Sequence, residues 1–167
     1  MSKILIVDDD IASCRTLQLH LRSQGNEVDI AHSVHEGQKT ARDREPELII
    51  LDIRMPGKSG LEGLPEFKQE FTGIKVIMIT AFHDMESTIE AMQNGADDYI
   101  HKPIDIDELD GAISKILSTS GSGEEILTAG SAANAGNPLT MVGRSRAMKE
   151  VFKTIGMVAK SPATILI

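Results

Sequence analysis

Short apolar runs alternate with longer amphipathic stretches over the first 118 residues of the chain. Continuous apolar runs of strand length are typical of strands buried on both faces of a sheet, and weaker runs fit flanking strands. These runs predict strands at 4–7, 28–31, 48–51, 76–79 and 98–100. Helical periodicity between them predicts helices at 11–24, 33–43, 60–71, 84–94 and 105–118. Five such units predict an α/β fold, a doubly wound parallel sheet with helices on both faces.

The alternation of apolar runs and amphipathic stretches stops after residue 118. The chain therefore divides into residues 1–118, 119–138 and 139–167. Residues 119–138 are rich in Gly, Ser, Ala and Asn without periodicity and are predicted to be a flexible linker. Residues 139–167 predict a helix that begins near Ser145, ends before Pro162 and is followed by the start of a buried strand. A natural C-terminal helical hairpin is the alternative for this last part.

Composition narrows the function classes. Aromatic residues make up only 3% of the chain and Trp is absent, which excludes an aromatic stacking platform for single-stranded nucleic acid. One cysteine, Cys14, excludes an internal disulfide framework, and it lies on the predicted apolar face of the first helix. No apolar run reaches the length of a membrane span and no signal peptide is recognisable, so we expect a cytoplasmic protein that binds no membrane.

The charge is distributed unevenly. Residues 1–118 hold 12 Lys and Arg against 22 Asp and Glu, a net charge of −10, whereas residues 119–167 hold 5 against 3, a net charge of +2. An acidic domain of this kind repels a phosphate backbone. The sequence therefore disfavours direct DNA binding by this chain.

Candidate chemistry gathers where the predicted strands end. Asp8, Asp9 and Asp10 follow the first strand, Asp52 follows the third, and Thr80 and Lys102 follow the fourth and fifth. Ligands of open α/β sheets bind at this edge. Taken singly, each of these features also fits an ordinary solvated turn or strand-end cap. Together they predict a site for phosphoryl transfer to a carboxylate, where Mg²⁺ and the Lys102 ammonium neutralise charge.

Four segments carry a resemblance to a known family. ILIVDDD, LIILDIRMPGKSGLEGL, VIMITAF and DDYIHKPID resemble the receiver domain of two-component response regulators, over about residues 3–118. The resemblance implies a flavodoxin-like sheet of five strands in the order 2-1-3-4-5 with five flanking helices. It also implies phosphorylation by a sensor histidine kinase, and a homodimer through the fourth helix, fifth strand and fifth helix.

The same resemblance assigns roles to residues of this chain. Asp52 is the phosphoacceptor, and Asp9, Asp52 and the carbonyl of Arg54 ligate Mg²⁺, with Asp8 acting through water. Lys102 contacts the phosphoryl group and precedes a cis Pro103, Thr80 is the switch hydroxyl, and Tyr99 is the switch aromatic. Arg54 and Phe82 flank the approach of a hydrolytic water. Neither side chain is a good acceptor for a water proton, which predicts a long-lived phosphate.

Residues 139–167 resemble the opening of the AAA+ domain of sigma-54-dependent transcriptional activators of the nitrogen-regulatory type. No GxxxxGK[ST] motif occurs in the chain, so we expect no ATPase activity from it. The only chemistry we expect of it is its own phosphorylation and dephosphorylation. In this interpretation sigma-54 RNA polymerase and DNA are contacted only by parts absent here.

Two other function classes stay open at this stage. One is a stand-alone phosphotransfer or interaction module with an unrelated tail. The other is an aspartyl-nucleophile phosphatase, although residues 52–54 lack the second Asp of its DxDx[TV] motif. His32 and His35 are three residues apart, and a surface pair is favoured over a zinc site because no further ligand lies nearby in the sequence.

Overall fold

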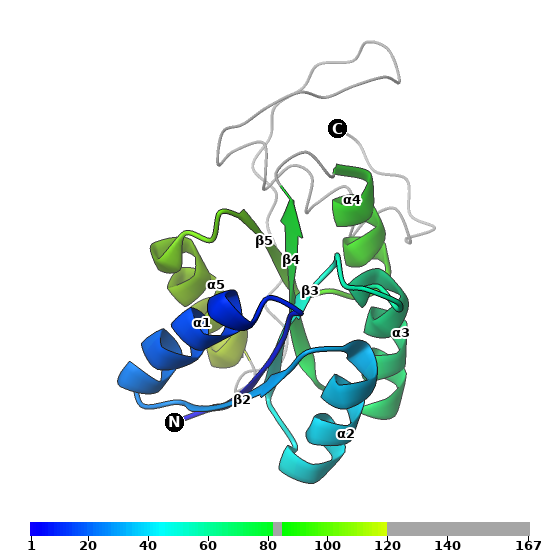
Figure 1. The fold of residues 1–167 in the computed structure, drawn as a ribbon. Helices are drawn as coiled ribbons and strands as arrows, with labels where there is room; N and C mark the ends of the chain where they lie inside the picture. Colours follow the sequence, from blue (N-terminus) through cyan, green and yellow to red (C-terminus); the bar gives the residue numbers. More distant parts are fainter. Residues whose placement is uncertain (82–84, 120–167) are drawn as a thin grey trace.

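The computed structural model describes residues 1–81 and 85–119, in which five strands alternate with five helices (Figure 1). The strands are β1 Lys3–Val7, β2 Glu27–Ala31, β3 Leu48–Asp52, β4 Lys75–Ala81 and β5 Asp98–Lys102. The helices are α1 Ile11–Ser23, α2 Val34–Arg44, α3 Gly60–Glu70, α4 Met85–Gln93 and α5 Ile106–Thr119. All neighbouring strands pair in parallel, in the order β2-β1-β3-β4-β5. This confirms the predicted fold class and strand order.

Helices cover both faces of the sheet: α1 and α5 lie on one face, and α2, α3 and α4 lie on the other (Figure 1). Because side chains alternate along a strand, each strand supplies both faces. Leu5 and Val7 of β1 join the hydrophobic cluster on the α2–α4 face, whereas Ile4 and Ile6 join the cluster on the α1–α5 face. Cys14 is fully buried in the α1–α5 cluster, as predicted.

Polar side chains cap the helices at the edge where the strands end. The Asp10 carboxylate accepts from the N–H groups of Ala12 and Ser13, so this residue begins α1. Ser33 caps α2, and the Asp105 carboxylate accepts from two N–H groups at the start of α5. Asp10 is therefore occupied as a cap, which separates it from its two acidic neighbours.

The α2–α3 pair is held together closely. A Cβ added at Gly63 of α3 would lie 2.7 Å from Cγ1 of Val34 in α2, so only glycine allows this approach. On the outer side of the pair, Gln38 Nε2 donates to Glu66 Oε2 at 2.7 Å. One turn further along both helices, Arg42 pairs with Glu70. The contact is thus specified both at its core and at its rim.

The remaining expectations concern residues beyond this part of the chain. The predicted linker, apart from Thr119 at the end of α5, and the segment 139–167 lie outside the described residues. Within residues 1–81 and 85–119, no helix is long and apolar enough to cross a bilayer.

Candidate functional site

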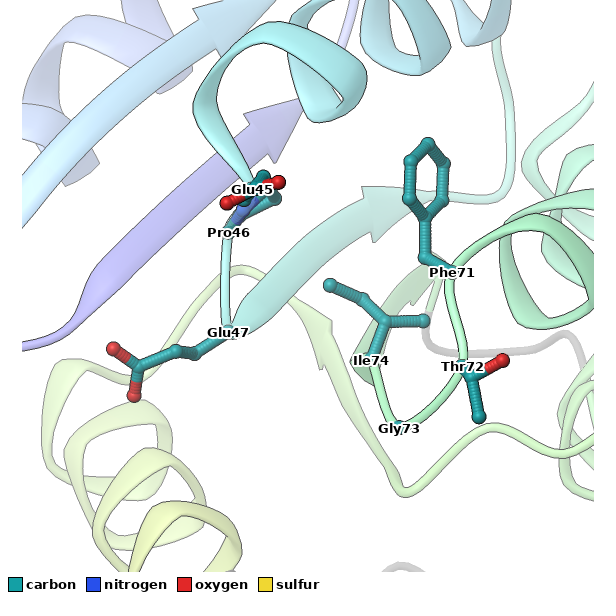
Figure 2. A pocket seen from close by; sticks show the side chains of 7 residues that line it. All are labelled: Glu45, Pro46, Glu47, Phe71, Thr72, Gly73 and Ile74. Carbon is teal, nitrogen blue, oxygen red and sulfur yellow. The ribbon is translucent and has the colours of Figure 1, made fainter.

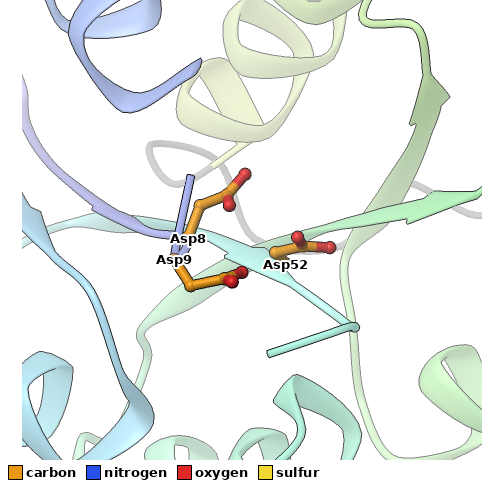
Figure 3. Close-up of side chains that lie close together, drawn as sticks. All are labelled: Asp8, Asp9 and Asp52. Carbon is orange, nitrogen blue, oxygen red and sulfur yellow. The ribbon is translucent and has the colours of Figure 1, made fainter. Parts of the chain in front are cut away.

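Three carboxylates meet at the carboxyl edge of the sheet (Figure 3). Asp8 and Asp9 follow β1, and Asp52 is the last residue of the neighbouring β3. One oxygen from each of the three lies within 4.8 Å of the others. Asp8 and Asp52 are buried, at 1% and 3% exposure, whereas Asp9 is exposed. An oxygen-only set of three carboxylates, open to water on one side, fits a hard divalent cation such as Mg²⁺.

Lys102, at the end of β5, supplies the positive charge of this cluster. Its Nζ lies 2.7 Å from Asp52 Oδ2 and 3.2 Å from Asp8 Oδ2. Burial lowers the pKa of the ammonium, but the hydrogen bond and charge of Asp52 and the charge of Asp8 outweigh burial and leave the pKa above 10.5. Lys102 therefore stays protonated at neutral pH. The Lys102–Pro103 peptide bond is cis, as the resemblance implied.

The electrostatics of Asp52 differ from those of a simple ion pair. Burial raises the pKa of its carboxyl most, the hydrogen bond from Lys102 lowers it, and the charge of Asp8 raises it again. The net shift is upward from 3.8, although an ion pair alone would push the pKa down. Burial and, after it, the charge of Asp8 thus disfavour the ionised form of Asp52, so additional positive charge at the site stabilises that form.

The loop after β3 wraps closely around Asp52. The N–H of Arg54 donates to Asp52 Oδ1 at 3.2 Å, and the N–H of Gly60, the first residue of α3, donates to the carbonyl of Ile53 at 3.0 Å. A Cβ added at Gly60 would stand 2.0 Å from the carbonyl oxygen of Asp52. The start of α3 therefore presses directly on the backbone of Asp52, and a side chain at residue 60 would displace it.

The predicted switch residues lie on β4 and β5. Thr80 is fully buried and pairs in register with His101. Tyr99 is 1% exposed, belongs to the hydrophobic cluster on the α2–α4 face, and packs edge-on against the ring of His101 with centroids 5.1 Å apart. The tyrosine ring is thus already inside in this conformation. Phe82 lies outside the described residues.

The family of the chain follows from its comparison with known proteins. Residues 4–114 match the response regulator receiver domain. This span includes all three carboxylates of the cluster and Lys102. The chain belongs to the response regulator receiver family. This confirms the resemblance on which the sequence predictions rested.

The relatives of this receiver include regulatory proteins, two of which are named as transcriptional regulators. The transcriptional regulatory protein ZraR of Salmonella typhimurium is 39% identical over 98% of this chain, and the regulatory protein AtoC of Escherichia coli is 33% identical over all of it. The DNA-binding transcriptional regulator NtrC of Salmonella typhimurium is 31% identical over 98% of the chain. The chain spans 34–36% of the length of these relatives.

Solved receivers share its fold. The receiver domain protein from Clostridium thermocellum is 31% identical, with a TM-score of 0.68, and the match covers 72% of this chain and 97% of that one. The receiver domain of NtrX from Brucella abortus is 31% identical, with a TM-score of 0.67 over 70% of this chain and 98% of that one. Both matches are receiver domains of similar overall fold.

A separate pocket of about 390 Å³ lies at the opposite edge of the sheet (Figure 2). Its lining comes from the loops that precede β3 and β4, namely Glu45, Pro46, Glu47, Phe71, Thr72, Gly73 and Ile74. These loops lie at the amino ends of the strands, a full strand length from Asp52. The pocket is therefore remote from the carboxylate cluster.

The sequence interpretation missed one set of contacts at the site. His32, expected only as a surface residue, is exposed but places Nδ1 3.0 Å from the carbonyl oxygen of Asp8. Cys14 Sγ lies 3.2 Å from the same oxygen. Spacing along the chain carries no signal for these contacts, because they depend on how α1 and the β2–α2 corner pack around the end of β1.

Proposed function

We propose that this chain is a phosphorylation-switched receiver in which Asp52 accepts a phosphoryl group from a phosphohistidine of a sensor histidine kinase. The observation that carries the proposal is the position of Asp52. It is buried between a second carboxylate, Asp8, and the ammonium of Lys102, with one oxygen 2.7 Å from Nζ. Positive charge that gathers at this site would stabilise both the buried carboxylate and the negative charge of an incoming phosphoryl group.

In the proposed reaction an oxygen of Asp52 attacks the phosphorus of the donor. The P–N bond to the donor imidazole breaks, its electron pair stays on the nitrogen, and an acyl phosphate forms on Asp52. The Lys102 ammonium already donates to Asp52 Oδ2, so it is placed to donate to a phosphoryl oxygen once the acyl phosphate has formed. The buried hydroxyl of Thr80, on the neighbouring strand, would donate to another phosphoryl oxygen.

We further propose Mg²⁺ as the cofactor. Asp9, Asp52 and the carbonyl of Arg54 would hold it, and Asp8 would act through water. The ion neutralises phosphoryl charge when bound. The residues themselves support this proposal, since three carboxylates with oxygens within 4.8 Å of one another repel each other and Lys102 brings only one positive charge to them.

Phosphorylation is proposed to act on assembly. A donor–acceptor contact between Thr80 and the phosphoryl group would pull the end of β4 toward Asp52 and favour the buried position of Tyr99. The surface formed by α4, β5 and α5 would then carry the change into a homodimer. Light scattering with and without beryllofluoride and Mg²⁺ tests this step, and a monomer in both states would contradict it.

The proposed output is an attached sigma-54-dependent ATPase, whose oligomerisation this receiver would control. Relatives described as transcriptional regulators, of which the chain spans about a third, favour this output over a stand-alone phosphotransfer module. Sigma-54 RNA polymerase and DNA would be contacted by other parts of such a protein.

The phosphoacceptor is tested directly by mass spectrometry. Incubation with acetyl phosphate and Mg²⁺ should add one phosphoryl group to the wild-type chain and none to the Asp52→Asn chain, because an amide is not a nucleophile. Asp43→Asn, an exposed carboxylate on α2, is the matched control and should be phosphorylated like the wild type. Stoichiometric phosphate on the Asp52→Asn chain would show that the acceptor is elsewhere.

A further inference from the structure

The peptide unit between Asp8 and Asp9, the two acids that follow β1, is held by side chains from α1 and from the corner between β2 and α2. The N–H of Asp8 donates to the carbonyl of Ala31 at 3.1 Å, which continues the pairing of β1 with β2. The carbonyl of Asp8, at the point where the strand pairing ends, accepts from Cys14 Sγ at 3.2 Å and from His32 Nδ1 at 3.0 Å. One oxygen thus receives a donor from α1 and a donor from the β2–α2 corner.

Both contacts are hydrogen bonds in which the Asp8 carbonyl oxygen is the acceptor. A carbonyl oxygen only accepts, so His32 must carry a proton on Nδ1. Cys14 is fully buried with Sγ 3.2 Å from the same oxygen, so its S–H is a second donor to the Asp8 carbonyl.

The corner that carries His32 is itself specified by its sequence. The N–H of His32 donates to Glu36 Oε2 at 2.8 Å, and the N–H of Glu36 donates to Ser33 Oγ at 3.2 Å. This reciprocal cap fixes the direction in which the chain enters α2. The imidazole thereby reaches from the corner between β2 and α2 to the Asp8 carbonyl beyond the end of β1.

The orientation of this peptide decides where Asp9 lies. The carbonyl of Asp8 and the N–H of Asp9 share one rigid plane, so a rotation of the plane swings Asp9 as a whole. Asp8 and Asp9 repel each other, and Asp9 is exposed, so its carboxylate is able to turn away from Asp8 toward water. Donors on the Asp8 carbonyl oppose that rotation.

We propose that His32, together with Cys14, is a positioning residue that locks the Asp8–Asp9 peptide and keeps the Asp9 carboxylate beside Asp8 and Asp52 before a cation binds. The inference rests on the proposed function, because it concerns the same Mg²⁺ site. A site organised in advance binds its ligand more tightly, since less order has to be imposed on binding. His32 acts through the backbone and touches neither the phosphoryl group nor the ion.

The test compares variants that differ in one donor. His32→Leu removes the Nδ1 donor, whereas His32→Asn keeps an N–H at the same branch of the side chain. His35→Leu, an exposed histidine on the first turn of α2, is the matched control. Isothermal calorimetry with MgCl₂ measures the affinity, and acetyl phosphate labelling measures the phosphorylation rate at low and at saturating Mg²⁺.

We expect His32→Leu to raise the Kd for Mg²⁺ about tenfold, in the range typical for partners of ligand residues. Its phosphorylation should be slow at low Mg²⁺ and return to within twofold of wild type at saturation. His32→Asn and His35→Leu should stay within twofold of wild type throughout. A purely structural role for His32 would not produce this dependence on Mg²⁺, nor rescue by Asn.

Several outcomes would overturn the inference. They are wild-type affinity in His32→Leu, an equal loss in His32→Asn, or a rate that stays low at saturating Mg²⁺. If His32→Leu does not fold, Cys14→Ala and Cys14→Ser make the same comparison, and equal Mg²⁺ affinities in that pair would refute it. Failure of the proposed function is distinguishable, because the wild-type chain itself would then bind no Mg²⁺ or carry no phosphate on Asp52.

Discussion

Replacing the phosphoacceptor should make the metal-free protein more stable. At an effective dielectric constant of about 20, the Lys102 ammonium at 2.7 Å attracts an ionised Asp52 by about 6 kcal/mol. An oxygen of Asp8 within 4.8 Å repels it by about 3.5 kcal/mol or more, and the exposed Asp9 adds a smaller repulsion that solvent screens. The repulsion from Asp8 alone therefore offsets more than half of the attraction. The cost of burying a carboxylate that is only 3% exposed is left without full compensation.

Asp52→Asn keeps the shape of the side chain and removes its charge, while Lys102 keeps Asp8 as a partner at 3.2 Å. We expect the free energy of unfolding to rise by about 1–2 kcal/mol at neutral pH in EDTA. The pH dependence has a defined sign. Because the pKa of Asp52 is raised from 3.8, the folded chain binds this proton more tightly than the unfolded chain. Wild type should therefore lose stability relative to the variant as the pH rises from 3.8 through the raised pKa.

Urea unfolding followed by far-ultraviolet circular dichroism measures the difference, with Asp43→Asn as the control for a lost exposed charge. Excess MgCl₂ should stabilise wild type more than Asp52→Asn, because the variant lacks one carboxylate ligand. An Asp52→Asn chain that is equally or less stable than wild type in EDTA would refute this account of the charges at the site.

Three further predictions concern the close approach at Gly60, the contact between α1 and α5, and the lifetime of the phosphoryl group. Gly60→Ala should lower the free energy of unfolding by roughly 3 kcal/mol and slow phosphorylation, because its Cβ meets the Asp52 carbonyl oxygen at 2.0 Å. Gly111→Ala in α5, where a Cβ meets nothing within 4 Å, should instead stabilise by about 0.5–1 kcal/mol; equal urea midpoints for the two variants would contradict the argument. His20 Nε2 lies 2.9 Å from Asp110 and ties α1 to α5, so a double-mutant cycle of His20→Ala and Asp110→Ala should give a coupling of about 0.5–1 kcal/mol, and none if the contact is absent in solution. Arg54→Asn and Phe82→Glu should each speed loss of the phosphoryl group by supplying an acceptor for the attacking water, and unchanged hydrolysis in both single variants and the double variant would remove these residues from that role.

The elements and the carboxylate cluster were accessible from sequence for simple reasons. Strands such as Leu48–Asp52 are buried on both faces and read as unbroken apolar runs, and the carboxyl ends of parallel strands meet at one edge. Asp8, Asp52 and Lys102 could therefore be grouped although they are far apart in the chain.

Other features depended on distances that no pattern encodes. The pairing of Lys102 with both acids and the contact of His32 with the Asp8 carbonyl are set by packing between elements distant in sequence. The requirement for glycine at residue 60 follows from a close approach of two backbones. The periodic pattern predicts which face of a helix or strand a residue occupies, but not which residue of a distant element packs against it.

The tight α2–α3 pair offers a fixed frame for an optical reporter. The close contact at Gly63 and the paired side chains at the rim hold the two helices together on the face of the sheet opposite α5. A label attached to this pair should therefore keep its position when other parts of the domain move. The native thiol of Cys14 is buried, with a pKa of about 11, and reacts slowly with maleimide dyes at neutral pH. A single cysteine introduced at the exposed Lys39 of α2 would therefore be labelled selectively, and a second at Lys115 of α5 would report distance changes against a stationary reference.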